Sequence, residues 1–142
     1  MLRSSGRIHR AKSAYRMQRI SATKEKTEGQ AKIAYGTANA KLMDEQAKLQ
    51  QIMFRKAGYE SQARKLVNGT IDVPKIKECK RAVDAMKTMQ RSQMMNVHVA
   101  EKNVELARNK LNEVMMERKT HEKLKEQAFE VFKQEMQYAE NK

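Results

Sequence analysis

The chain has few of the cysteine, histidine and aromatic residues that build many catalytic and metal-binding sites. It has one cysteine, one proline, no tryptophan and only 5% aromatic residues. The lone Cys79 excludes an internal disulfide and fits a reducing compartment. The five glycines are scattered, so there is no glycine-rich phosphate-binding loop. The three histidines are isolated from one another and from the cysteine, and none has zinc-ligand spacing: they are His9, His98 and His121.

Long apolar runs are also missing. No stretch approaches the roughly 18 apolar residues of a membrane span, and residues 1–26 hold no apolar run of the secretory kind. Carboxylate pairs such as Glu113 and Glu117 lie four apart on one helix side, where solvation is expected rather than catalysis. We therefore predict a protein that is not an enzyme, with no cofactor, no metal and no small-molecule ligand.

What the chain does have is charge and a helical apolar pattern. Its 142 residues are 39% hydrophobic and 33% charged, which is too polar for a thick core and suits an elongated pair of helices. The formal net charge is +13, and the basic residues are concentrated in the first 26 positions, where Glu25 is the one acid. Such an end is expected to seek an anionic surface.

Apolar residues recur in a four–three alternation from Ala31 to Leu66. The alternation has eleven positions in this arm, and nine of them are apolar or aromatic. The other two are Glu45 and Lys56, and polar residues in a seam can define the register of the two helices. The predicted seam residues of this arm are Leu42, Leu49, Ile52 and Leu66.

A second arm follows the same alternation from Ile76 to Ala139. Its best run has six apolar positions in succession, and its predicted seam residues are Val97, Val104, Leu111 and Val114. Beyond Val114 the apolar side shifts, because Leu124, Val131 and Met136 lie off this register. The shift predicts local unwinding of the supercoil or a change of partner.

Between the arms, residues 68–74 have the composition of a turn. Asn68 and Gly69 tolerate a left-handed helix end, Asp72 can cap the next helix, and Pro74 suits its first turn. We predict an all-α fold, a long antiparallel coiled-coil hairpin. Residues 1–12 form a basic lead expected to fray. A single domain, 13–142, has helices at about 13–67 and 73–141.

Two alternatives use the same residues. A parallel dimer of one bent helix satisfies the same heptads, although the capped break at Pro74 favours the hairpin and a monomeric free state. A generic adaptor, or a basic-zipper-like dimer, would bind nucleic acid or a membrane through the basic end. Acids dilute the basic residues after position 24, and no base-reading cluster is present, so nucleic-acid binding is not expected.

Three strings carry a resemblance to a known family. They are YRMQ at residues 15–18, EGQAK at 28–32 and, most specific, ERKTHEKL at 117–124. With them the chain resembles clostridial-type members of the flagellar export protein FliJ family, over about residues 13–140. The resemblance implies a slender coiled coil shaped like the gamma stalk of rotary ATPases.

The same resemblance implies the partners and the place of action. FliJ-like proteins insert into the hexameric ring of the flagellar export ATPase, contact the export-gate membrane protein and escort export chaperones. They act in the cytoplasm, peripherally associated with the cytoplasmic face of the cell membrane at the flagellar base. We expect residues 13–30 and 118–140 to enter the ring, and basic side chains to meet carboxylates there: Arg16, Arg19, Lys24, Lys26, Arg118, Lys119 and Lys123.

Overall fold

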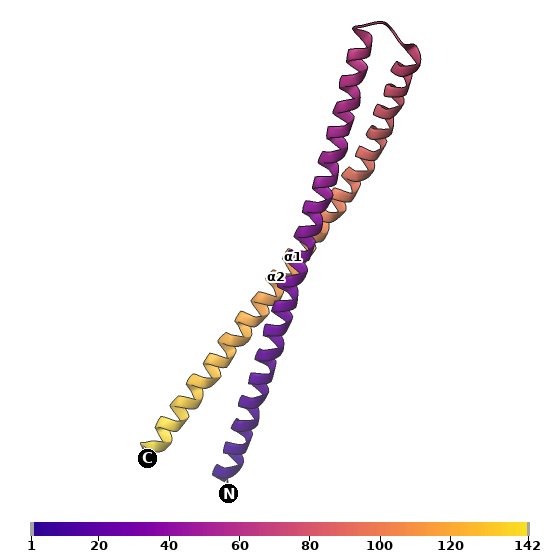
Figure 1. Cartoon of the computed structure of the whole chain (residues 1–142). Helices are drawn as coiled ribbons and strands as arrows, with labels where there is room; N and C mark the ends of the chain where they lie inside the picture. The colour runs from indigo at the N-terminus through magenta and orange to yellow at the C-terminus, as the bar shows by residue number, and fades with distance from the viewer. Residues whose placement is uncertain (1, 142) are drawn as a thin grey trace. The chain divides into compact units, whose positions relative to one another are not determined.

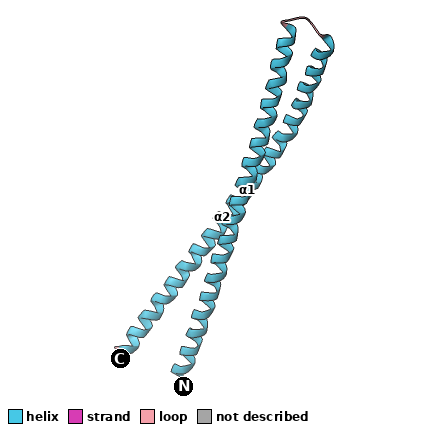
Figure 2. Ribbon diagram, viewed as in Figure 1, coloured by secondary structure: helices cyan, strands magenta, loops and turns pink. Residues whose placement is uncertain are grey.

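The structure, a computed structural model, describes residues 2–141 and consists of two long helices joined by one short loop. Helix α1 spans Leu2–Val67 and helix α2 spans Val73–Glu140. Within the described residues there is no strand (Figure 2). The all-α helical hairpin predicted from the sequence is confirmed.

The described residues group into two compact units, and each contains a piece of both helices. One unit is Gly36–Leu106, with the loop, and the other combines Met1–Tyr35 with Ala107–Lys142. In the loop-containing unit, α1 and α2 run side by side in opposite directions (Figure 1). Helix α1 begins at Leu2 rather than near residue 13, so the expected lead of residues 1–12 lies within the helix from Leu2 on.

The loop between the helices ends as the sequence suggests but begins differently. The Asp72 side chain accepts a hydrogen bond from the backbone N–H of Lys75 at 3.3 Å, and Pro74 lies in the first turn of α2. This is an N-cap of the expected kind. The left-handed helix end expected at Asn68 and Gly69 is wrong, because no described residue has a positive φ. Instead α1 ends in a tighter turn, in which the Asn68 N–H donates to the Lys65 carbonyl at 3.3 Å.

The core of Gly36–Leu106 is a narrow seam one side chain deep. Its buried apolar residues are Met86, Val97, Ala100 and Val104, all on α2. The positions of α1 at the predicted four–three spacing are half-buried, apart from Glu45, which is buried: Leu42, Leu49, Ile52, Lys56, Tyr59, Ala63 and Leu66. A spacing of three and four residues returns to one side of a helix, so these side chains meet the other helix.

The unit that contains both chain ends has a seam of its own, which stops before the end of α2. Ala31 on α1 and Val114 on α2 are buried, and Leu111 is half-buried. Along α2 the partial burial continues to Lys125, and residues 126–141 are exposed throughout. The four–three positions beyond Lys125 therefore do not form a covered seam: Ala128, Phe132, Glu135 and Ala139.

Candidate functional site

The predicted contact residues lie in the unit that contains both chain ends, on two helices. On α1, Arg16, Arg19 and Lys26 are exposed and Lys24 is half-buried. On α2, Lys119 and Lys123 are exposed. These six side chains supply part of the unit's accessible positive charge, beside other exposed cations such as Arg7, Lys12 and Lys32.

Part of this charge surrounds a shallow hollow on α1. The hollow has a volume of about 310 Å³ and is lined by Arg16, Arg19, Ile20, Thr23 and Lys24. The Arg19 guanidinium lies over the Tyr15 ring, 5.9 Å from its centroid, which holds the charge near the helix surface. The arrangement suits an anionic group with a small apolar portion.

Arg118, the seventh predicted contact residue, has a different environment. Its Nε donates to the Glu28 carboxylate on α1, and its Nη1 donates to Glu122 Oε1 at 2.9 Å. Only 22% of its side chain is exposed. The hydrogen bonds that it donates to Glu122 and, next in effect, to Glu28 raise the pKa of Arg118 above its usual value. Arg118 thus points into the seam and joins the two helices, which its position in the four–three pattern could have indicated.

Two further polar contacts cross the seam in this unit. The His121 Nε2 donates to the Met17 carbonyl oxygen at 3.2 Å. The Arg108 Nε donates to the Tyr35 hydroxyl at 3.4 Å, and its guanidinium carbon lies 5.9 Å from the centre of that ring. The helices are therefore connected here largely by polar and cation–π contacts, with few buried apolar residues.

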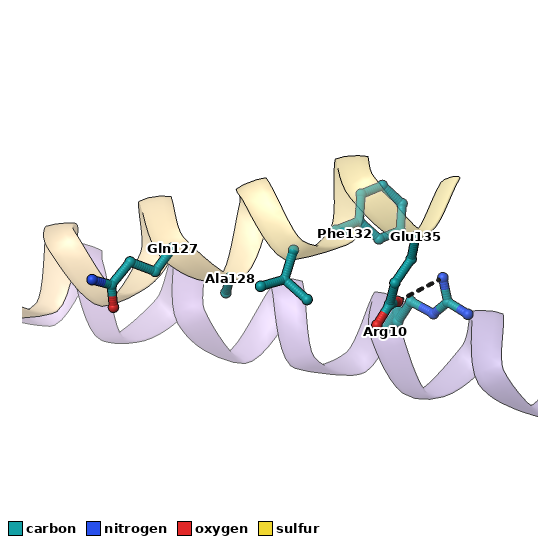
Figure 3. A pocket seen from close by; sticks show the side chains of 6 residues that line it. Arg10, Gln127, Ala128, Phe132 and Glu135 are labelled. Carbon is teal, nitrogen blue, oxygen red and sulfur yellow. Dashed lines mark ion pairs between the residues drawn. The ribbon is translucent and has the colours of Figure 1, made fainter. Parts of the chain in front are cut away.

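At the far end of this unit, Arg10 of α1 meets the last turns of α2 (Figure 3). Its Nη1 lies 3.5 Å from Glu135 Oε2, and its guanidinium lies 5.8 Å from the centre of the Phe132 ring. Sequence reasoning missed this contact, because residues 1–12 were expected to fray.

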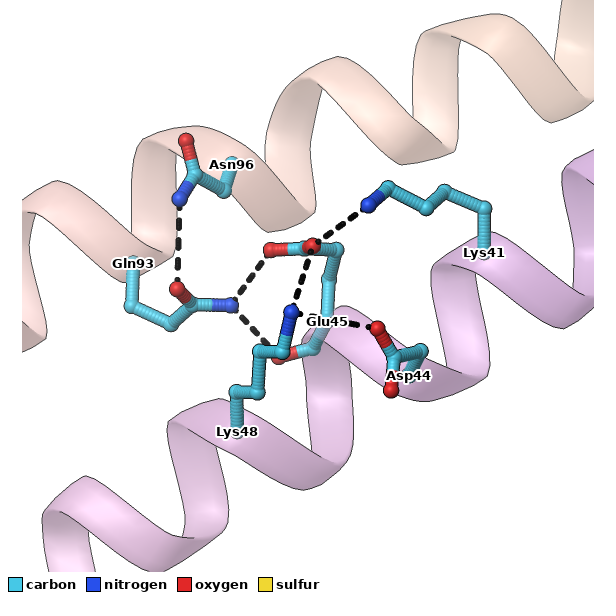
Figure 4. A network of polar contacts seen from close by, with 6 residues as sticks. All are labelled: Lys41, Asp44, Glu45, Lys48, Gln93 and Asn96. Atoms are coloured by element: carbon cyan, nitrogen blue, oxygen red, sulfur yellow. Dashed lines mark hydrogen bonds and ion pairs between the residues drawn. The ribbon is translucent and has the colours of Figure 1, made fainter.

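The loop-containing unit holds a buried polar cluster (Figure 4). Gln93 Nε2 on α2 donates to Glu45 on α1 twice, to its carbonyl oxygen at 2.8 Å and to its carboxylate at 2.6 Å. Asn96 Nδ2 donates to Gln93 Oε1 at 3.2 Å, and Lys41 Nζ lies 3.1 Å from the Glu45 carboxylate. Hydrogen bonds from Gln93 and Lys41 lower the pKa of Glu45.

A second polar pair lies nearer the loop, where Lys56 Nζ donates to Gln90 Oε1 at 2.9 Å. Glu45 and Lys56 are the two polar interruptions that the sequence places in the first arm's seam. Both find a glutamine of α2 as partner, so the buried polar atoms are satisfied and the pairing of the helices is specified.

The described residues 2–141 show no grouping typical of metal sites. No cluster of three or more His, Cys, Asp or Glu side chains that could hold a metal ion occurs among them. Neither helix, as far as it is described, has a stretch long and apolar enough to cross a membrane.

Comparison with known proteins identifies the family. The family model for the flagellar FliJ protein matches residues 13–142, nearly the whole chain. No curated protein and no solved structure matches. The helical hairpin agrees with this match. The chain therefore belongs to the FliJ family, and it is a component of the flagellar protein export apparatus.

Proposed function

We propose that this chain is a non-enzymatic stalk of the flagellar export apparatus, inserted into the ring of the export ATPase through its paired helix ends. The observation that supports this is the group of accessible cations on the two helices around the pair of Glu28 and Arg118. Two packed helices are about 20 Å across, since each helix with its side chains is 10–12 Å wide. Such a pair is narrow enough to enter a ring pore.

The contacts of this stalk would be electrostatic and individually weak. Exposed ion pairs stabilise a contact by about 0–1 kcal/mol each. Several weak pairs hold a stalk in a ring while still allowing it to turn or slip. Of the seven cations expected from the sequence, Arg118 is assigned to holding α1 and α2 together, and the other six to the ring wall.

Charge reversal tests this proposal. A variant with Arg16, Arg19, Lys119 and Lys123 changed to Glu is expected to lose stimulation of the export ATPase, measured as phosphate release at low salt. A matched control reverses four exposed cations of the loop-containing unit and should stimulate normally: Lys77, Lys80, Arg81 and Lys87. Undiminished stimulation by the first variant, with circular dichroism showing both variants helical, would rule the proposal out.

The remaining roles are assigned to the loop-containing unit. We propose that Gly36–Leu106 contacts the export-gate membrane protein and export chaperones. We also propose that the chain acts in the cytoplasm, on the cytoplasmic face of the cell membrane at the flagellar base. Its free form is proposed to be a monomer, because the seam positions of α2 as far as Lys125 are at least partly covered by α1 of the same chain. Sedimentation of the purified chain at a mass near 33 kDa, twice its 16.5 kDa, would contradict the monomer.

A further inference from the structure

The last turns of α2 carry an apolar stripe that the hairpin does not cover. Leu124, Val131 and Tyr138 follow one another at intervals of seven residues, which places them on one side of the helix. Their exposed fractions are 54%, 53% and 66%. All three lie off the register of the seam, one position before Lys125, Phe132 and Ala139. The side of α2 that α1 partly covers is marked instead by Arg118, His121 and Lys125.

This stripe borders a groove between the two helices. The groove has a volume of about 360 Å³ and is lined by Ala128, Val131 and Phe132 of α2, with Arg10, Gln127 and Glu135 (Figure 3). Its α2 wall is therefore mainly apolar, and its α1 wall carries a guanidinium. Arg10 lies over the Phe132 ring and beside Glu135, and both members of that ion pair are about half exposed.

The two helices also differ in charge along this unit. Residues 1–35 hold nine Lys or Arg against two acids, whereas residues 107–142 hold eight against seven. An occupant of the groove therefore meets apolar side chains on its α2 side and strong positive potential on its α1 side. Complementarity requires the opposite arrangement on the occupant, apolar toward α2 and acidic toward α1.

We infer that this groove and the stripe beside it bind an amphipathic acidic helix of a partner protein. A repeat of seven residues, about 10.5 Å along the helix axis, matches the repeat of apolar residues on a second helix packed alongside. A carboxylate on the partner's acidic edge takes the position of Glu135 on Arg10. This rests on the proposed function, in which the partner helix belongs to the wall of the ATPase ring, and it adds an apolar contact to the electrostatic one.

The experiment measures binding of the full chain to the purified export ATPase at 50 and 300 mM salt. The test variant is L124S/V131S, in which both changed side chains are exposed and their loss leaves the seam intact. The control is Met116→Ser, which removes an exposed apolar side chain of α2 outside the stripe. Circular dichroism of each variant alone checks its helix content, and sedimentation checks its self-association.

The inference predicts that L124S/V131S binds at least tenfold more weakly at both salt concentrations, while Met116→Ser binds like the unchanged chain. A loss below tenfold, or an equal loss in the control, overturns it. Self-association of the unchanged chain that disappears in L124S/V131S also overturns it, because the occupant is then a second copy. If charge reversal at Arg16, Arg19, Lys119 and Lys123 weakens binding but L124S/V131S does not, the proposed function stands and this inference falls. No binding by the unchanged chain overturns both.

Discussion

Arg118 on α2 donates a hydrogen bond to the carboxylate of Glu28 on α1, and both side chains lie mostly within the seam. The positive charge at position 118 is thus matched inside the hairpin, next to the exposed Lys119. Two adjacent basic residues therefore have different roles: Arg118 connects the two helices, whereas Lys119 is exposed and available to a partner.

Replacing Arg118 with Ala is expected to lower the melting temperature of the hairpin by several degrees. The change leaves the Glu28 carboxylate in the seam without its main partner. Removing one member of such a pair lowers the folding stability more than removing both. Thermal unfolding followed by circular dichroism measures the effect. Lys119→Ala is the matched control and should melt like the unchanged chain. The double variant with Glu28→Leu and Arg118→Met should recover stability; a double variant as unstable as Arg118→Ala would refute the explanation.

Glu45 should make the hairpin less stable in acid. Hydrogen bonds from Gln93 and Lys41 lower its pKa in the folded chain below the ordinary value of 4.5. Because the pKa of Glu45 is lower in the folded than in the unfolded chain, its carboxylate stabilises the fold at pH values above the unfolded-state pKa. This contribution is lost as the pH falls through the folded-state pKa. Denaturant midpoints of the unchanged chain and of Glu45→Gln, compared between pH 7 and pH 3, measure this. The two proteins should converge toward low pH, and a constant difference over that range would disprove the role of the carboxylate.

Three glycines in the interior of α1 are expected to destabilise it. A methyl group added at Gly29, Gly36 or Gly58 would meet nothing within 4 Å, and none of them has a positive φ. Each change to Ala should stabilise the chain by about 1 kcal/mol, because glycine loses more backbone entropy in a helix than alanine does. Chemical denaturation gives the free energy of unfolding. Gly69→Ala in the loop serves as control with a smaller gain, and destabilisation by the helical changes would contradict the prediction.

The N-cap at Asp72 should contribute to the folding stability of the hairpin. Changing Asp72 to Ala removes the acceptor of the Lys75 N–H and should cost about 1 kcal/mol of unfolding free energy. Asp72→Asn retains a capping oxygen and should cost only a few tenths of that amount. The measurement is again equilibrium denaturation, and equal losses in both variants would show that charge, and not capping, is responsible.

The helices, the position of the turn and the seam-facing side of each arm could be read from the sequence. These are local properties. Apolar residues spaced three and four positions apart mark one side of a helix, and Asp72 with Pro74 can start a new helix whatever its later direction. The polar positions Glu45 and Lys56 were visible as interruptions, although their partners were not.

Tertiary structure alone decided which side chain each polar seam residue meets. Arg118 and Glu28 lie 90 positions apart, and Glu45 and Gln93 lie 48 apart, so their pairing depends on how the two helices align and not on any local pattern. It also decided that the covered seam ends at Lys125, which leaves Leu124 and Val131 exposed, and that α1 closes without a left-handed residue. A single sequence gives the period of each helix, whereas register and the extent of burial arise only when the two surfaces come into contact.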